Sequence, residues 1–408
     1  MALAMYNIPK NSFSSLQLIV IRQLPVRYSS SSSDVVDSVD KKFPKIKSDL
    51  HSLKRGTGGR SSFNGKVATV FGASGFLGRA VVNQLGKMGT QVVIPYRTDP
   101  YNILRLKLCG DLGQILFTPF FLKDEASIAK AMKYSDIVIN LIGRDYETPN
   151  FKYKDVHVTG ARNIARLAKE AGVQTLLHVS TLNASENPKP IVSKKGSGLY
   201  SSKWEGEQAV REEFPDAIIF RPSDMWGQQD SFIYYYNNIA RRTWRAMSLW
   251  KKGVGIIKQP VYGSDVAKGI VKAVCDPDAA GHTFQAVGPH RYELSELMDW
   301  FHRIMLRTRE RLYYRLDLRM DPTFWPRLLI AEKVLPRYRT LSWGRLERES
   351  KTDVVNPDLP NLQDLEINLT PMEERIFYEL KPFRIHAYHD QLLRDYIRPV
   401  EPCPLATN

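Results

Sequence analysis

The chain of 408 residues contains only three cysteines, Cys109, Cys275 and Cys403, which stand far apart and show no paired spacing. So few and so widely separated cysteines do not favour a zinc site or a disulfide framework, and they are typical of proteins from a reducing compartment. We therefore predict no metal site. The sequence also lacks the roughly 18 to 20 consecutive apolar residues that a bilayer-crossing helix needs, so we expect any membrane contact to be peripheral or through partners.

Acidic residues are missing from the first 33 positions, which are rich in serine and contain Lys10, Arg22 and Arg27. This composition is typical of a mitochondrial presequence, to which we assign residues 1–28; a disordered N-terminus is the alternative. Removing residues 1–28 takes three positive charges from the formal net charge of +15 and leaves +12. The basic chain is expected to have an acidic or anionic partner, whether protein, phosphate or lipid headgroup.

The most informative segment is an apolar run, Val67–Phe71, that leads directly into glycines spaced three apart. A strand, such a glycine turn and an amphipathic helix form the pattern of a dinucleotide-binding site. Gly72 allows the tight turn, Gly75 lets the backbone approach a pyrophosphate, and Gly78 lets the helix pack closely on its strand. The pyrophosphate would then lie at the helix N-terminus. An ordinary glycine turn is the alternative.

The second apolar run, Gln91–Tyr96, is followed by Arg97 at the position where an acidic residue would bind a ribose 2′-hydroxyl. An arginine there suits a 2′-phosphate, which favours NADP(H) over NAD(H) as the cofactor. Asp99, two residues further on, is the counter-argument. A solvated loop position is the alternative for Arg97.

Strand-like and helix-like segments alternate from about residue 64 to residue 220, which predicts βαβ crossovers and a parallel sheet covered on both faces. We predict an α/β fold with a Rossmann-type doubly wound sheet, a smaller C-terminal α/β lobe and an extended tail. Strands are expected at residues 67–71, 91–96, 115–117, 137–142, 175–179 and 217–220, and helices at 79–87, 103–108, 127–132, 155–171 and 200–214.

The domain organisation follows from these segments. We assign residues 29–63 to a linker, 64–230 to an NADP-binding domain, 231–345 to a C-terminal lobe with a sheet-completing segment near 254–290, and 346–408 to a C-terminal tail. Further elements of secondary structure are expected at 324–335, 371–380 and 386–396.

Basic residues alternate with tryptophan in residues 231–252, whose first part is expected to be helical. The residues are Arg241, Arg242, Trp244, Arg245, Trp250, Lys251 and Lys252. Such a run can bind nucleic acid or a lipid surface. The alternative is a solvated helix face with buried aromatic side chains.

Five motifs together resemble those of an atypical extended short-chain dehydrogenase/reductase. They are GASGFLG at 72–78, NLIG at 140–143, HVST at 178–181, RPSDMWG at 221–227 and YGSDVA at 262–267. The longer runs at 140–148 and 169–173, with the presequence-like N-terminus, are similar to the alpha-subcomplex subunit-nine family of accessory subunits in mitochondrial respiratory complex I. The resemblance implies other complex I subunits as partners, no nucleic acid, and a position on the matrix side of the inner membrane. It further implies NADPH held without turnover. We expect the tail to contact other subunits, and we expect any contact with inner-membrane lipid to be peripheral.

The motifs and the resemblance together predict one set of cofactor-binding residues. The set is Gly72, Ser74, Gly75, Phe76, Leu77, Gly78, Arg97, Leu122, Leu141, Ile142, Gly143, Ser180, Lys203, Pro222 and Ser223.

Active members of this superfamily use a tyrosine and a lysine four residues later, which lie on the same face of one helix. The lysine lowers the pKa of the tyrosine, which exchanges a proton with the substrate. Here Tyr200 stands three residues before Lys203, and Leu199 occupies the place of the proton donor. Since one residue turns a helix by about 100°, we predict no catalytic residue. Tyr200 is a displaced candidate that a frayed first turn would restore.

Two further positions depart from the family pattern. Leu182 stands where a serine or threonine would hydrogen-bond the reacting oxygen, and Thr181 is the substitute that a shifted loop would provide. Phe121 stands where an acidic residue would accept from adenine, which suggests aromatic stacking on the base. Asp124 is assigned to a helix cap.

The predicted function is therefore a non-catalytic accessory subunit of complex I that holds NADPH as a structural cofactor and supports assembly at the junction of the matrix and membrane arms. An active mitochondrial NADP-dependent short-chain reductase or epimerase is the first alternative. An RNA- or lipid-binding protein is the second.

Overall fold

The computed structural model describes residues 56–405 except 57, 98, 193–195, 239–240, 244–245, 308–312, 334–340 and 385–397. All of them belong to one compact unit, His51–Asn408. The predicted presequence 1–28, most of the linker 29–63 and the element expected at 386–396 lie outside the described residues.

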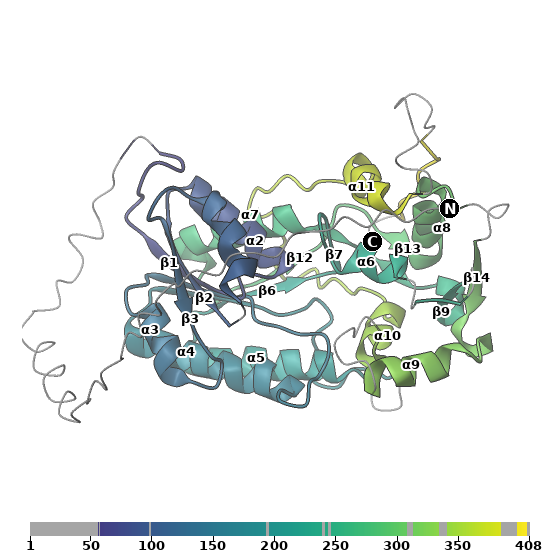
Figure 1. The fold of residues 1–408 in the computed structure, drawn as a ribbon, viewed down its shortest axis with the longest axis horizontal. Helices are drawn as coiled ribbons and strands as arrows, with labels where there is room; N and C mark the ends of the chain where they lie inside the picture. The colour runs from purple at the N-terminus through teal and green to yellow at the C-terminus, as the bar shows by residue number, and fades with distance from the viewer. Residues whose placement is uncertain are drawn as a thin grey trace, which may run out of the picture. The chain divides into compact units, whose positions relative to one another are not determined.

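A parallel seven-stranded sheet forms the centre of the N-terminal part, in the order β12-β6-β5-β4-β1-β2-β3 (Figure 1). Its strands are β1 (Val67–Phe71), β2 (Gln91–Tyr96), β3 (Ile115–Pro119), β4 (Ile137–Asn140), β5 (Thr175–Val179), β6 (Ile218–Pro222) and β12 (Thr283–Ala286). The order reverses direction beside β1, as in a doubly wound sheet. The fold class that the alternating segments predict is thus confirmed.

Helices cover both faces of this sheet because its strands are apolar on both sides. On one face lie α2 (Phe76–Lys87), α7 (Gly263–Cys275) and the 3₁₀ segment η1 (Pro100–Cys109). On the other lie α3 (Glu125–Met132), α4 (Gly160–Ala171) and α5 (Gly198–Glu213). Along β4, Ile137 and Ile139 face the first layer and Val138 faces the second.

Local sequence signals locate most of these boundaries. The side chain of Asp124 accepts from the amide of Ala126 and caps α3, as predicted, and α4 ends at Gly172 in the left-handed conformation with φ 74°. Several expectations were wrong in detail, and the helix expected at 103–108 is the longer 3₁₀ segment η1. The strand expected at 137–142 ends at Asn140, and the helix expected at 155–171 begins with a π-helical turn, η2 (Asp155–Thr159).

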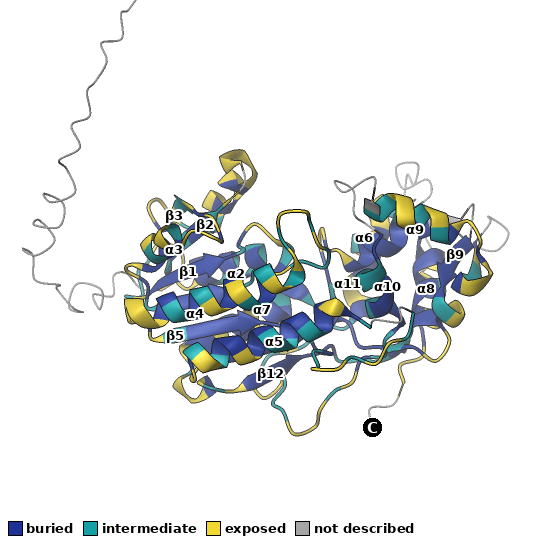
Figure 2. Cartoon of the chain, turned by 90° about the horizontal axis from the view of Figure 1, so that it is seen from below, coloured by how far each residue is buried: buried dark blue, intermediate teal, exposed yellow. Residues whose placement is uncertain are grey.

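The C-terminal lobe has its own core, which is rich in aromatic side chains. Figure 2 shows buried segments of α6 and α8 in this lobe. Its helices are α6 (Phe232–Asn237), α8 (Leu294–Ile304), α9 (Phe324–Lys333), α10 (Trp343–Ser350) and α11 (Met372–Leu380). Its strands and 3₁₀ segments are β7 (Met225–Trp226), β8 (Arg242–Thr243), β9 (Ala246–Leu249), η4 (Trp250–Gly253), β10 (Ile257–Lys258), β11 (Val261–Tyr262), β13 (Tyr292–Glu293), β14 (Tyr314–Asp317), η7 (Leu318–Met320) and η9 (Lys381–Phe383). The short 3₁₀ segment η5 (Pro277–Ala279) connects α7 to β12 in the first domain.

The basic segment before residue 252 is not one continuous helix. It is helical over α6, as predicted, but the chain then forms β8 and β9. Arg241 is buried against Glu349 instead of facing solvent, whereas Lys251 and Lys252 are exposed. The interpretation as one solvated helix face was therefore wrong.

Residues assigned to the tail pack on the chain itself. Leu362 and Leu365 belong to the core beside α7, and Asn361 forms a bridge with Gln285 of β12. The segment after α10 thus extends back over the first domain. No helix among the described residues is both long and apolar enough to span a bilayer.

Candidate functional site

A cavity of about 450 Å³ opens at the carboxyl ends of β1, β4, β5 and β6, where doubly wound folds bind their ligands. Eleven of the fifteen predicted cofactor-binding residues line it. They are Gly72, Gly75, Phe76, Leu77, Gly78, Leu141, Gly143, Ser180, Lys203, Pro222 and Ser223.

The other four predicted residues lie elsewhere. Ser74 is exposed on the turn after β1, and Ile142 packs against the core of the second helix layer. Arg97 and Leu122 line a second cavity of about 470 Å³.

The glycine turn has no room for side chains at two positions. Gly72 has φ +81°, and a β-carbon there would lie 3.1 Å from the carbonyl of Leu141. A β-carbon on Gly78 would lie 2.4 Å from the carbonyl oxygen of Gly72. Gly75 is the N-cap of α2 and provides no side chain to the amides of the first turn. These amides are free to bind an anion, so the turn fits a pyrophosphate.

Polar groups suited to ribose hydroxyls lie on the facing wall. The Nζ atom of Lys203 donates to the carbonyl of Val179 at 2.9 Å, which leaves two of its N–H groups for a ligand. Burial lowers the pKa of Lys203 to about 8. The nearby Glu207 opposes this decrease, and Arg348 adds to it. The hydroxyl of Ser180 is buried and has no partner among the described residues. A dinucleotide would satisfy both groups.

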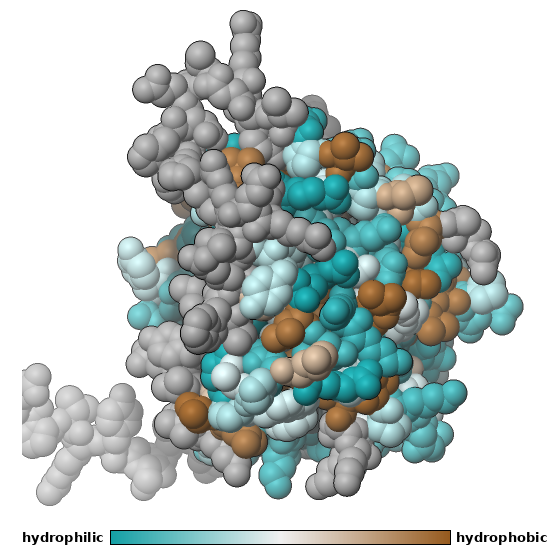
Figure 3. All heavy atoms as spheres, turned by 90° about the vertical axis from the view of Figure 1, so that its right-hand side faces the viewer, coloured by the Kyte–Doolittle hydropathy of each residue, from teal (hydrophilic) through white to brown (hydrophobic). Residues whose placement is uncertain are grey.

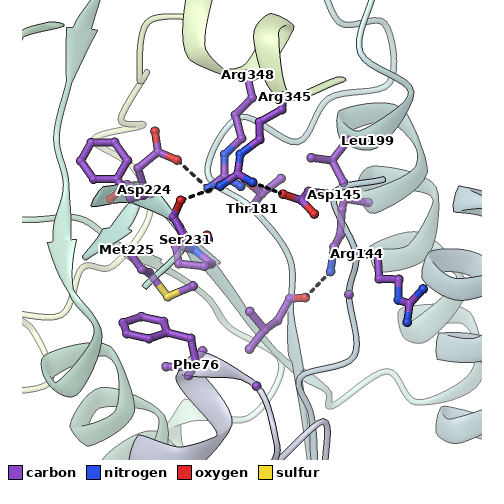
Figure 4. A pocket seen from close by; sticks show the side chains of 18 of the residues that line it. Phe76, Arg144, Asp145, Thr181, Leu199, Asp224, Met225, Ser231, Arg345 and Arg348 are labelled. Atoms are coloured by element: carbon purple, nitrogen blue, oxygen red, sulfur yellow. Dashed lines mark hydrogen bonds and ion pairs between the residues drawn. The ribbon is translucent and has the colours of Figure 1, made fainter. Parts of the chain in front are cut away.

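Leu199 lines the cavity at the place of the missing proton donor (Figure 4). Tyr200 is not among the described residues that line the cavity, and it is only 2% exposed. The centroid of its ring lies 4.5 Å from the ammonium of Lys351. Burial raises the pKa of Tyr200 to about 12, even though Lys258 and Arg348 oppose the increase. Tyr200 belongs to the first turn of α5, which begins at Gly198, and this turn is closed because the amide of Ser201 donates to the carbonyl of Ser197 at 3.4 Å. No frayed turn redirects the phenol toward the cavity.

The two other departures from the family pattern have different outcomes. Thr181 lines the cavity. Leu182 is buried and is not among the described residues that line the cavity, and its amide donates to the carbonyl of Pro222. Thr181, the residue directly before Leu182, thus provides a hydroxyl group at the cavity wall. Phe121 is 61% exposed at the edge of the second cavity.

The far wall of the cavity comes from α10, which sequence reasoning missed. Arg348 forms an ion pair with Asp224 at 2.5 Å, and Arg345 forms one with Asp145 at 3.4 Å (Figure 4). Arg345 also donates to the carbonyl oxygen of Ser231 at 2.6 Å. These contacts join α10, which begins in the segment assigned to the C-terminal lobe and ends in the one assigned to the tail, to the loops after β4 and β6. Nothing in the local sequence of α10 indicates this position.

Buried ionic contacts fix α10 in place. Burial favours the neutral carboxyl of Asp224, but Arg348 and Lys258 outweigh that effect and lower its pKa to about 2. The carboxylate of Glu347 accepts from the amides of Ile191 and Val192 at 2.5 and 2.9 Å. The carboxylate of Asp224 therefore stays charged near neutral pH, and the contacts of Asp224 and Glu347 hold the helix against the cavity.

The second cavity has three cations and no acidic residue in its described lining. The guanidinium of Arg97 and the ammonium of Lys123 lie 5.8 and 4.8 Å from the ring centroid of Phe151. Burial and the nearby Arg144 lower the pKa of Arg97, an effect that a bound anion would reverse. Asp99 accepts from the amide of Tyr101 and caps η1. The site therefore fits a phosphate beside a stacked ring.

A buried histidine connects the cavity wall to α5. The amide of Arg144 donates to Nε2 of His157 at 3.2 Å, so the proton of this imidazole lies on Nδ1, which faces the hydroxyl of Ser202 at 2.9 Å. That hydroxyl donates to the carbonyl of Leu199. Burial, with Lys203 and His178 adding to it, lowers the pKa of His157 to about 2. Burial and Lys203 lower that of His178 to about 3.

We expect the two histidines to make the fold sensitive to acid. Both pKa values are depressed in the folded chain, so below pH 6.5 the unfolded chain binds protons that the folded chain does not. The free energy of unfolding should fall by about 2 kcal/mol per histidine between pH 7 and pH 5. Urea unfolding at both pH values should show a smaller loss for His157→Gln. Substitution of the exposed His282 by glutamine should leave the loss unchanged, and an identical loss in all three proteins would contradict this assignment.

The class of protein follows from the parallel sheet, the glycine turn and the cavity at the strand ends. Residues 68–288 match the NAD dependent epimerase/dehydratase family. The crystal structure of DesIV, a dTDP-glucose 4,6-dehydratase from Streptomyces venezuelae with NAD and TYD bound, has the same fold. The TM-score is 0.58 at 14% identity, over 80% of this chain and 97% of that one. The chain belongs to this family, whose members and fold neighbours bind NAD or NADP.

Within that class, curated relatives define a narrower family. The mitochondrial NADH dehydrogenase [ubiquinone] 1 alpha subcomplex subunit 9 of Mus musculus is 44% identical over 82% of this chain and 85% of its own length. The mitochondrial NADH-ubiquinone oxidoreductase 40 kDa subunit of Neurospora crassa is 34% identical over 82% of this chain and 84% of its own length. The chain is a member of this subunit 9 family. The resemblance stated from the sequence motifs is thus confirmed.

Proposed function

We propose that the chain is a non-catalytic accessory subunit of mitochondrial respiratory complex I that holds NADPH as a structural cofactor. It acts on the matrix side of the inner membrane, where it supports assembly at the junction of the matrix and membrane arms. Other complex I subunits and peripheral inner-membrane lipid are its partners. We retain the domain boundaries at residues 63 and 230 as part of this proposal. The boundary at 345 falls within α10, and Leu346 and Met372 beyond it pack in the core of the C-terminal lobe. The names of the relatives support the assignment to the complex.

The observation that carries the proposal is the position of Leu199 in a cavity whose phosphate turn is intact. When bound, a nicotinamide dinucleotide would supply hydride chemistry. The residues of this chain that face it can bind and orient it, since Lys203 and Ser180 have unused polar capacity. Leu199 cannot donate a proton, and loss of a positioned acid or base removes roughly 10² to 10⁴ in rate.

The ion pairs of α10 support retention instead of exchange. Arg345 and Arg348 reach across the cavity to Asp145 and Asp224, and they occupy the side opposite the glycine turn. A substrate would have to displace them. A bound nucleotide would stabilise the folded chain by mass action without being turned over.

An active NADP-dependent reductase or epimerase is the second candidate, and Thr181 and Lys203 in the cavity favour it. The buried position of Tyr200 and its raised pKa argue against it.

Native mass spectrometry of protein isolated from mitochondria distinguishes the two functions. Our proposal expects NADPH and complex I subunits to be retained together, with no oxidation of NADPH by sugar-nucleotide, steroid or quinone substrates. Turnover that Tyr200→Phe abolishes would establish the second candidate. Protein without dinucleotide would contradict the structural cofactor.

We expect Arg97→Glu to weaken binding of NADPH by about tenfold or more, because it replaces a charge-assisted contact with repulsion. NADH, which lacks the 2′-phosphate, should be affected much less. Dinucleotide affinities from titration calorimetry measure this ratio. Lys87→Glu reverses an exposed charge at the far end of α2 and is the matched control. Equal losses for NADPH and NADH would refute recognition of the 2′-phosphate by Arg97.

A further inference from the structure

One exposed turn of the C-terminal lobe combines basic and apolar side chains. We call it the Trp250 tip. It consists of Trp250, Lys251 and Lys252 of η4, of Val254 directly after η4, and of Arg319 and Met320 of η7. Val254 is 56% exposed and Met320 is 71% exposed. Figure 3 shows the side of the lobe that faces right in Figure 1, on which hydrophobic and hydrophilic residues alternate.

Packing attaches the Trp250 tip firmly to the lobe. The ring of Trp250 is half-buried against the core of the lobe, and the guanidinium of Arg319 lies 4.7 Å from its centroid. The amide of Val254 donates to the carbonyl of Lys251 at 3.2 Å and closes the turn. The exposed side chains are therefore presented by an ordered turn.

The backbone of this turn is strained at two successive lysines. Lys251 has φ 49° and Lys252 has φ 59°, a left-handed conformation that glycine adopts more easily. Strain of this kind is concentrated at functional sites. Lysine costs more free energy than glycine at both positions, and both ammonium groups are exposed on the turn.

These two ammonium groups have no anionic partner in the part of the chain that the structure describes. Arg315 pairs with Asp299 at 3.1 Å, and Arg319 lies 3.8 Å from Asp317. No described carboxylate lies within 4.0 Å of Lys251 or Lys252. The neighbouring arginines are thus compensated within the lobe, and the lysines are the charges left for an external anion.

We infer that the Trp250 tip rests on the surface of an anionic lipid bilayer. Lysine is depleted in the cores of protein interfaces, whereas tryptophan and lysine together are characteristic of the membrane–water boundary. Anionic headgroups attract the lysines, and Val254 and Met320 enter the boundary region. The contact is peripheral, since it involves only a turn. This inference rests on the position beside the inner membrane proposed above.

Vesicle flotation of the full-length chain tests the inference. We expect the chain to float with vesicles of phosphatidylcholine and cardiolipin, and to stay behind with phosphatidylcholine alone. Added salt should weaken the binding. The double variant Lys251→Glu/Lys252→Glu should lose about tenfold or more in partition. The control Lys133→Glu/Lys169→Glu, which reverses two exposed lysines of the first domain, should change it less than about twofold.

A second variant separates binding from folding. Lys251→Gly/Lys252→Gly relieves the left-handed strain, so its thermal midpoint should equal or exceed that of the parent while its partition falls. Unchanged partition in either tip variant would overturn the inference, as would equal flotation with both vesicle types. Displacement from the vesicles by single-stranded RNA would replace it with nucleic-acid binding. Bound dinucleotide, measured in the same samples, is independent of these outcomes, so its absence would contradict only the proposed cofactor.

Discussion

Replacement of Glu349 by alanine should lower the free energy of unfolding by about 3–5 kcal/mol, because it leaves a buried guanidinium without its counter-ion. The side chains of Arg241 and Glu349 are only 1% and 3% exposed. The hydroxyl of Tyr235 donates to the same carboxylate at 2.9 Å and would lose its acceptor. Since Glu349 belongs to α10, the variant should also release bound dinucleotide faster than the parent protein does.

Urea denaturation and dinucleotide release after dilution measure the two effects. The matched control is Glu212→Ala, which removes the partner of Arg162 at the surface, where the two side chains are 64% and 45% exposed. Such exposed pairs contribute about 0–1 kcal/mol. A loss below about 1 kcal/mol in Glu349→Ala would mean that the buried pair does not hold the helix.

Gly75→Val should reduce bound dinucleotide about a hundredfold or more, because its methyl groups would occupy the space of the pyrophosphate. Gly75 has φ −71°, so the backbone accepts a side chain without strain. A β-carbon would meet only the carbonyl oxygen of Gly72, at 3.3 Å. The variant is therefore expected to fold, and the loss should be specific to the cofactor.

Extraction and quantification of nucleotide from the purified variant measure this effect, with circular dichroism as the test of folding. Gly75→Ala adds only the β-carbon and should lose much less nucleotide. A folded Gly75→Val protein with normal nucleotide content would show that the glycines serve the turn alone.

The fold could be predicted because its signals are local. The boundaries of β1, β2 and β5 agree with the sequence expectation, since apolar runs of five or six residues between turn residues have few other solutions. The same holds for the glycine turn, whose function depends on the absence of side chains at fixed spacing. The replacement of Tyr by Leu199 could also be predicted, because helix geometry relates each position to Lys203.

The far wall of the cavity depended on contacts between distant segments. Arg348 and Asp224 are 124 positions apart in the chain and meet only because residues after α10 return to the sheet near β12. The charges of Arg345 and Glu349 are indistinguishable in sequence from those of a solvated helix. In the folded chain Glu349 forms a buried ion pair with Arg241, whereas Arg345 forms an ion pair with Asp145 across the cavity.

The sequence by itself determined the strands of the sheet, the glycine turn and the three-residue spacing of Tyr200 and Lys203, because each depends on periodicity or spacing within about ten residues. Only the tertiary structure decided that a segment assigned to the tail closes the cavity, that Arg241 is buried, and that Lys251 and Lys252 stand exposed on a strained turn. The physical reason is that burial and charge pairing belong to segments brought together by folding, and the free energy of an ion depends on those surroundings far more than on its neighbours along the chain.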